Sequence, residues 1–181
     1  MKNSLLHAAP GFDDPLGLLR ACHTRIRQRC TLLDRIIEHI EKEGADEQVR
    51  QACRQVLNYF RTSGKQHHQD EECDLFPALL EACDADKREA FQDVVDSLQA
   101  DHHVMAQAWD ALEPALQALE GGAAQTLDPK LVERFQTLYL PHIDREEIAA
   151  FDAAAQCLDA AALERIGRAM AARRNAAYPL G

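Results

Sequence analysis

Histidine and glutamate recur at a four-residue spacing in the segment HHQDEECDLFPALL, residues 67–80. His67 precedes Glu71 by four residues, and His68 and Glu72 repeat the pair one position later. Side chains four residues apart lie on one face of an α-helix, with their Cβ atoms about 5–6 Å apart. An imidazole nitrogen and a carboxylate oxygen placed in this way can bind one metal cation, because both donate an electron pair. A solvated ion pair explains the same spacing, so the elements that carry the pairs must decide between the two.

Two further pairs with this spacing occur, His39 with Glu43 and His142 with Glu146. The composition indicates that helices carry all of them, because aromatic residues make up only 6% of the chain and alanine, leucine, glutamate, glutamine and arginine dominate. The length of 181 residues is that of one domain with a proper core, and we treat residues 1–181 as a single domain.

Charge and hydropathy argue against two classes of partner. The formal net charge of −10 disfavours nucleic acid and anionic membrane surfaces. No stretch approaches the length of a transmembrane helix, and the apolar run near the N-terminus is too short for a signal peptide. We therefore expect a cytoplasmic protein without a nucleic-acid or membrane partner, and a homodimer is compatible with the sequence.

The cysteines show neither a Cys-x-x-Cys pair nor a zinc-finger spacing, and we expect reduced thiols. Cys30 and Cys53 fall at apolar-face positions, where a thiol packs as a small hydrophobic group. The six cysteines are Cys22, Cys30, Cys53, Cys73, Cys83 and Cys157.

Apolar periodicity and helix boundary signals predict an all-α fold. Residues 1–14 are expected to form an extended arm that ends at the helix start Asp13-Asp14-Pro15. Long helices are predicted over 15–43, 46–82, a third stretch that ends near 120, and 128–156, and a short helix begins the segment 159–181. Four long amphipathic helices with short connections predict an up-down-up-down four-helix bundle, with the short C-terminal helix packed on its outside.

Such a bundle would bring one histidine of each long helix to the same height. His23 lies about as far before the first turn as His67 lies after it, and His102 and His142 agree with this level within about one turn of helix. Two of these helices add a glutamate one turn after the histidine. Four histidines and two carboxylates would then face one level of the core.

The faces of the helices separate these residues from their neighbours. His23 and His102 share their helical stripes with apolar residues, whereas His103 lines up with Asp96 and Asp110 on a polar face. We expect His7, His39, His68, His103 and Glu72 to lie at the surface or around the ligands. The predicted metal ligands are His23, His67, Glu71, His102, His142 and Glu146.

Six ligands of this kind predict two metal ions rather than one. A tetrahedral zinc site takes four ligands, whereas two carboxylates can bridge a pair of cations. Imidazole combined with carboxylate favours iron, with manganese or zinc as alternatives.

The order His, His-x-x-x-Glu, His, His-x-x-x-Glu resembles the hemerythrin-like HHE cation-binding family. The resemblance extends from LLRACHTRI through HHQDEECDLFP and LQADHHVMAQAW to YLPHIDREE. In that family the first histidine of the string ending in LFP is a ligand, and Phe76-Pro77 align this position with His67. The resemblance implies a non-haem centre of two iron ions, Fe2+ or Fe3+, joined by an oxo or hydroxo bridge.

The chain departs from the oxygen-carrying hemerythrins at two positions. Ala106 stands where they carry a second histidine four residues after the third-helix ligand. Their last motif ends with an aspartate after a longer spacing, where Glu146 now stands. One iron therefore lacks an imidazole, which predicts an open or water-filled coordination position. We expect it to face a small pocket lined by Gly64 and Ala106, with Tyr139 as a third candidate.

Three functions follow from this reading. The first is a di-iron protein whose centre binds a small ligand such as O2, NO or peroxide, as a sensor, carrier or scavenger. The second is a di-iron redox enzyme that consumes peroxide or NO. The third, iron storage or donation or the repair of iron clusters, ranks lower because the repair proteins of the family carry an N-terminal cysteine and residues 1–14 contain none. A purely structural helical bundle is the remaining alternative.

Overall fold

A computed structural model describes residues 9–179 of the chain. Over this range every regular element is helical, and the predicted all-helical fold is confirmed. His7 and most of the predicted arm, residues 1–8, lie outside the described residues. Among the helices of this range, none combines the length and the apolar character needed to cross a membrane.

The first helix, α1, spans Pro15–Glu43 and has the predicted bounds. It begins where Asp14 accepts a hydrogen bond from the backbone N–H of Gly17, and Pro15 occupies the first helical turn, where its missing N–H is not needed. It ends at Gly44, whose φ of 84° is a conformation that favours glycine.

The predicted helix over 46–82 is helical throughout but contains two π-helical segments. It consists of α2 (Glu47–Tyr59), a first π-helical segment (Phe60–Gly64), α3 (Lys65–Asp70), a second π-helical segment (Glu71–Leu75) and α4 (Phe76–Ala82). A π-helical turn holds one extra residue, so it rotates the side chains that follow relative to those that precede. Regular helical periodicity does not reveal such insertions.

The second half of the chain also follows the predicted order. It consists of α5 (Arg88–Glu120), α6 (Pro129–Glu146), a third π-helical segment (Glu147–Phe151), α7 (Asp152–Cys157) and α8 (Ala160–Arg173). Asp128 and Asp159 cap α6 and α8 through side-chain oxygens that accept backbone N–H groups.

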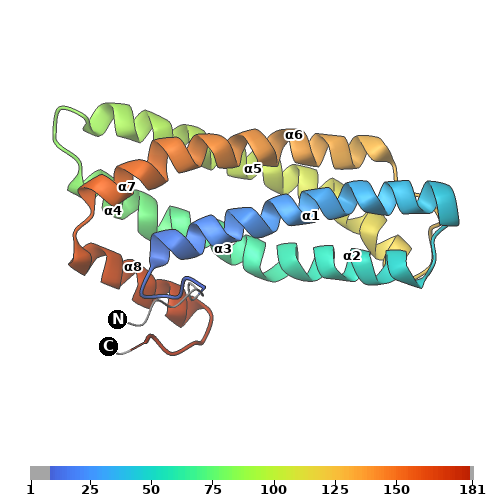
Figure 1. Cartoon of the computed structure of the whole chain (residues 1–181). Coiled ribbons are helices and arrows are strands. Elements are labelled where there is room, and N and C mark those ends of the chain that lie inside the picture. The colour runs from blue at the N-terminus through green and yellow to red at the C-terminus, as the bar shows by residue number, and fades with distance from the viewer. Residues whose placement is uncertain (1–8, 180–181) are drawn as a thin grey trace, which may run out of the picture.

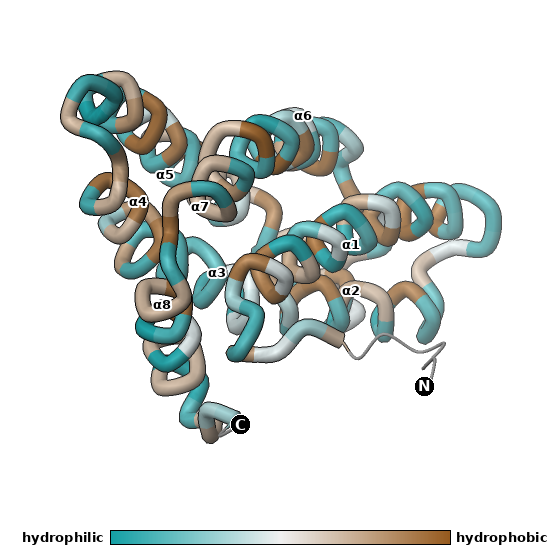
Figure 2. The backbone as a smooth tube through the Cα atoms, turned by 60° about the vertical axis from the view of Figure 1, so that its left-hand side comes forward, coloured by the Kyte–Doolittle hydropathy of each residue, from teal (hydrophilic) through white to brown (hydrophobic). Residues whose placement is uncertain are grey.

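The long helices pack in a closed ring. Helix α1 packs against α2 and α6, and α5 packs against the same two helices (Figure 1). Helix α8 lies across the end of the bundle where α1 begins and contacts α1 and α3. Hydrophobic and hydrophilic residues alternate along the turns of the long helices (Figure 2), as expected when one face is buried and the other is solvated.

Two apolar clusters fill the bundle, and a polar layer lies between them. On α1, Leu19 belongs to one cluster and Ile26 to the other, and the buried His23 lies between these two positions. The same order holds on α5 around His102, with Leu98 in one cluster and Met105 in the other. The predicted ligands therefore lie in the middle of the core, with apolar packing on both sides.

Helix α8 does more than cover the outside of the bundle. Its end supplies Arg173 and Arg174, and both form ion pairs with Asp70, whose side chain is completely buried. The Arg174 Nη2 to Asp70 Oδ2 distance is 2.5 Å, and Arg173 also reaches Asp74 at 2.7 Å. These guanidinium groups supply the positive charge that a buried carboxylate requires.

We expect the double substitution Arg173→Ala with Arg174→Ala to destabilise the protein more than Asp70→Asn. Without the arginines, the Asp70 carboxylate stays buried with no counter-charge, and losses of about 3–5 kcal/mol are typical of such a change. Without the carboxylate, the arginines can return to solvent, because their side chains are already 20% and 18% exposed. Urea denaturation followed by circular dichroism measures the difference. The control is Arg165→Ala, which changes an exposed residue of the same helix. Equal losses of stability in the double arginine variant and in Asp70→Asn would contradict the prediction.

Candidate metal centre

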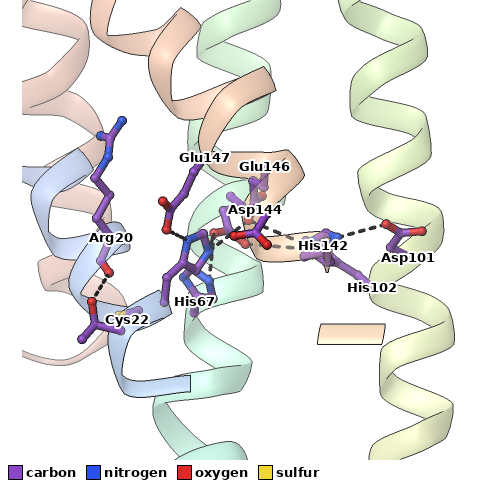
Figure 3. Close-up of polar contacts among 12 residues, drawn as sticks. Arg20, Cys22, His67, Asp101, His102, His142, Asp144, Glu146 and Glu147 are labelled. Carbon is purple, nitrogen blue, oxygen red and sulfur yellow. Dashed lines mark hydrogen bonds and ion pairs between the residues drawn. The ribbon is translucent and has the colours of Figure 1, made fainter. Parts of the chain in front are cut away.

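The structure brings all six predicted ligands into one buried layer. Figure 3 labels four of them, His67, His102, His142 and Glu146. Each of the six residues is at most 4% exposed. They come from α1, α3 with the π-helical segment that follows it, α5 and α6. In chain order they are His23, His67, Glu71, His102, His142 and Glu146.

The six residues form two groups that share one glutamate. In each group, one ligand atom per residue lies within 4.8 Å of the others. Glu146 belongs to both groups, and its Oε2 lies 3.1 Å from His23 Nε2 and 3.6 Å from His142 Nε2. The first group is His23, His67, Glu71 and Glu146, and the second is His102, His142 and Glu146.

Glu71 also lies between the two groups. Its Oε1 is 3.1 Å from His67 Nε2, and its Oε2 is 3.7 Å from His102 Nε2. Both glutamates therefore have oxygens near histidines of each group, which is the arrangement that carboxylates bridging two cations would need.

Three of the four histidines are held through their outer nitrogen by a carboxylate. His23 Nδ1 lies 2.9 Å from Glu147 Oε1, and His102 Nδ1 lies 2.7 Å from Glu72 Oε1. His142 Nδ1 makes the third such contact, 3.1 Å from Asp101 Oδ2. When Nδ1–H donates to a carboxylate, the imidazole keeps the tautomer whose free electron pair is on Nε2, and the Nε2 atoms are those that face inward.

One rule describes the positions of all three carboxylates, but the sequence analysis found only one of them. Each is the chain neighbour of a predicted ligand on one helix and holds a histidine on another. Glu147 follows Glu146, and Asp101 precedes His102. Only Glu72, the neighbour of Glu71, was expected to lie at the surface or around the ligands. A search for acidic residues directly beside the predicted ligands would have found the other two.

Glu71 and Glu146 have few hydrogen-bond donors around their carboxylates. Both carboxylate oxygens of Glu71 and Oε1 of Glu146 are buried and have no hydrogen-bond partner within the described residues. Burial, with a smaller contribution from the negative charge of Glu146, raises the pKa of Glu71 well above its usual value. Burial also lowers the pKa of His67 and of His142. A cation would supply the missing positive charge and accept the electron pairs of neutral imidazoles, so the donor set fits a bound metal.

Three histidines that were not predicted as ligands belong to the described residues, and they lie in three different places. His103 is exposed on α5. His39 Nε2 lies 3.1 Å from Asp46 Oδ2, near the start of α2 and away from the ligand layer. His68 lies around the ligands, because its ring stacks on that of His102 with a centroid distance of 4.0 Å and an interplanar angle of 7°.

A cavity of about 410 Å³ opens beside the ligand layer. Gly64, Ala106 and Tyr139 are among the residues that line it. None of the six predicted ligands lines it, however, and His68 forms part of its wall instead. The cavity therefore does not reach the ligand layer directly, since the imidazole that stacks on His102 lies between them.

The protein is an all-helical bundle with buried histidine and glutamate groups that could hold cations. These features place it in the class of metal-binding helical bundles. The sequence matches the Hemerythrin HHE cation binding domain family over residues 14–154. It is also 33% identical over 164 residues to an uncharacterized protein of Haemophilus influenzae, an alignment that covers 91% of this chain and 92% of the relative. The chain belongs to the hemerythrin HHE cation-binding family.

Burial gives the metal-free protein a predictable response to pH. The unfolded chain takes up protons on His67, His68 and His142 as the pH falls through about 6.5, whereas the lowered pKa values keep these groups neutral in the folded chain. Protons then favour the unfolded state, so these histidines make stability fall with pH. Glu71 acts in the opposite direction, because its raised pKa lets the folded chain keep a proton that the unfolded chain has lost above about 4.5.

Between about pH 4.5 and pH 6.5, the three histidines change the free energy of unfolding more than the one glutamate does. We therefore expect the free energy of unfolding of the metal-free protein to be lower at about pH 5 than at about pH 7. Denaturant titrations at the two pH values, at one ionic strength and with a chelator present, measure it. Equal or greater stability at the acidic value would show that the buried histidines do not control the response.

Proposed function

We propose that this protein is a non-haem di-iron protein whose centre binds a small ligand such as O2, NO or peroxide, as a sensor, carrier or scavenger. The observation that carries the proposal is the pair of histidine and glutamate groups that share Glu146 in a fully buried layer. Iron bound there would supply a redox-active centre at which a small ligand can bind.

The proposal assigns the metal-binding role to His23, His67, Glu71, His102, His142 and Glu146. It places them in an up-down-up-down four-helix bundle that forms a single domain over residues 1–181. It also includes an open coordination position on one iron and a cytoplasmic location. Whether the chain acts alone or as a homodimer does not change the ligand set, since all six residues come from one chain.

The residues around this layer have separable tasks. Glu147, Glu72 and Asp101 orient three imidazoles and hold the proton on Nδ1. The apolar clusters on either side exclude water, which strengthens the attraction between a cation and the two glutamates. The His23 ring also stacks on Phe151 at a centroid distance of 4.9 Å, which limits its rotation.

A redox enzyme that consumes peroxide or NO is the second candidate. Ala106 favours it, because this residue stands where the oxygen-carrying hemerythrins have a histidine, and the open coordination position proposed for one iron would leave room for redox chemistry. Sustained consumption of peroxide or NO by the iron-loaded protein would favour the enzyme, and saturable binding without turnover would favour the binding protein.

We expect anaerobic loading with Fe2+ to give about two iron ions per chain, measured by elemental analysis after desalting. His67→Ala and His142→Ala should each lose most of this iron, because each removes an inward-facing imidazole. His103→Ala and His68→Ala should keep it at excess metal. Less than one iron per chain in the unmodified protein would reject the proposal, and equal loss in the His67 and His68 variants would show that the ligand register is wrong.

A carboxylate that holds an outer nitrogen should affect affinity rather than stoichiometry. We expect Glu147→Ala to weaken iron binding by about 10- to 100-fold, while the protein still takes up its full complement at saturating iron. Competition with a chelator of known affinity measures the change. Asp144→Ala is the matched control, because Asp144 lies three residues earlier, in the last turn of α6, and pairs with Arg27 at the surface. A similar weakening in both variants would mean that the effect is one of general charge.

A further inference from the structure

We propose that the cavity beside the ligand layer binds a small, neutral, planar aromatic molecule that carries a hydroxyl group, as a phenol does. The site is distinct from the proposed metal centre, because none of the six predicted ligands lines it. It lies between α5 and the stretch that runs from the first π-helical segment into α3, and Tyr139 of α6 closes one side.

The size and walls of the cavity favour an organic ligand. A volume of about 410 Å³ falls within the range of about 300–1,000 Å³ that is typical of small-molecule sites. Phe60, Trp109 and Tyr139 form aromatic walls, with ring centroids 5.0 Å apart for Phe60 and Trp109 and 5.5 Å apart for Phe60 and Tyr139. The buried ring of Phe135 packs behind all three and fixes their positions. Aromatic rings attract another ring through edge-to-face and offset stacked contacts, which an aliphatic molecule of the same size cannot make.

Two polar side chains on the wall are free to bind a hydroxyl group. Within residues 9–179, neither the His68 imidazole nor the Tyr139 hydroxyl makes a hydrogen bond, and the ring centroids of the two lie 6.1 Å apart. A ligand hydroxyl can donate to an imidazole nitrogen of His68 and accept from the Tyr139 hydroxyl. Tyr59 provides the contrast, because its hydroxyl donates to the backbone carbonyl of Cys22 at 3.1 Å.

The charges around the cavity favour a neutral ligand. Its lining includes two basic residues, Arg61 and Lys65, and two acidic residues, Asp110 and Glu113. Arg61 and Glu113 already pair with each other, with Nε and Oε1 2.6 Å apart. A balanced rim of this kind gives neither an anion nor a cation a net attraction.

A ligand in this cavity would lie one imidazole ring away from the proposed centre. It would contact His68, whose ring is stacked on that of His102. The site is therefore placed to sense the state of the ligand layer while remaining outside it.

The single tryptophan of the chain, Trp109, lines the cavity and reports its occupancy. We expect phenol to change the tryptophan fluorescence of the full chain in a saturable way, with binding heat detected by calorimetry at the same concentrations. Cyclohexanol, which has the hydroxyl group but no planar ring, and benzoate, which is planar but anionic, should bind more weakly. Equal binding of cyclohexanol or benzoate, or no saturable response to phenol, would overturn the proposal.

Two substitutions test where the phenol binds. Ala106→Phe should fill the cavity and abolish binding, whereas Ala111→Phe adds the same side chain at an exposed position of α5 that does not line the cavity and should leave binding unchanged. His68→Phe keeps a ring that can stack on His102 but removes the hydrogen bond, so phenol affinity should fall by roughly 2- to 12-fold.

Each variant is checked for helical content and iron uptake, so that loss of folding or of the metal centre is seen separately from loss of phenol binding. Retained affinity in folded Ala106→Phe would show that phenol binds elsewhere. Unchanged affinity in folded His68→Phe would overturn the assignment of His68 as the hydroxyl-binding group.

Discussion

The rest of this structure depends on one constraint, the burial of the Glu71 and Glu146 carboxylates in the same layer. Within residues 9–179, three of their four oxygens have no hydrogen-bond partner. Negative charge in an apolar interior is strongly unfavourable unless a positive group lies close by. Four histidines surround the pair, but their burial favours the neutral form for at least His67 and His142. A folded chain that keeps both carboxylates charged in this layer would therefore gain stability from a cation, and the layer that could hold it lies between two apolar clusters.

A set of contacts between helices holds this layer in register. Glu147, beside one ligand on α6, holds His23 on α1, and Asp101, beside another on α5, holds His142 on α6. The orientation of these two imidazoles thus depends on the packing of two helices rather than on one. A contact between helices also involves Asp70, the chain neighbour of Glu71. Two arginines from the end of α8 balance the charge of Asp70. Folding of the C-terminal helix and the electrostatics of the ligand layer are therefore linked.

The π-helical segments lie directly beside the ligands and the cavity. Gly64 ends the first segment and lines the cavity, Glu71 begins the second, and Glu146 precedes the third. Each inserted residue rotates the helix that follows, so a stretch can turn a ligand inward and still return its apolar face to the core beyond it. Between α2 and α4 this allows one continuous helical stretch to contribute to both clusters and to the ligand layer. Phe60 belongs to the apolar cluster that contains Ile26, and Leu75 belongs to the one that contains Leu19.

The sequence by itself determined the helices, their caps and the level at which the histidines meet, because periodicity, capping residues and equal chain distances from a turn are local properties. It also ranked His67 above His68, because His67 follows Phe60 and Gly64 at helical spacing, whereas His68 follows two basic residues. The tertiary structure alone decided the partners that come from elsewhere in the chain: the carboxylates on Nδ1 atoms, the arginines on Asp70, and the position of His68 against His102. These contacts join residues far apart in sequence, and whether two such side chains meet depends on helix rotation, which the π-helical insertions change without leaving a mark in the periodicity.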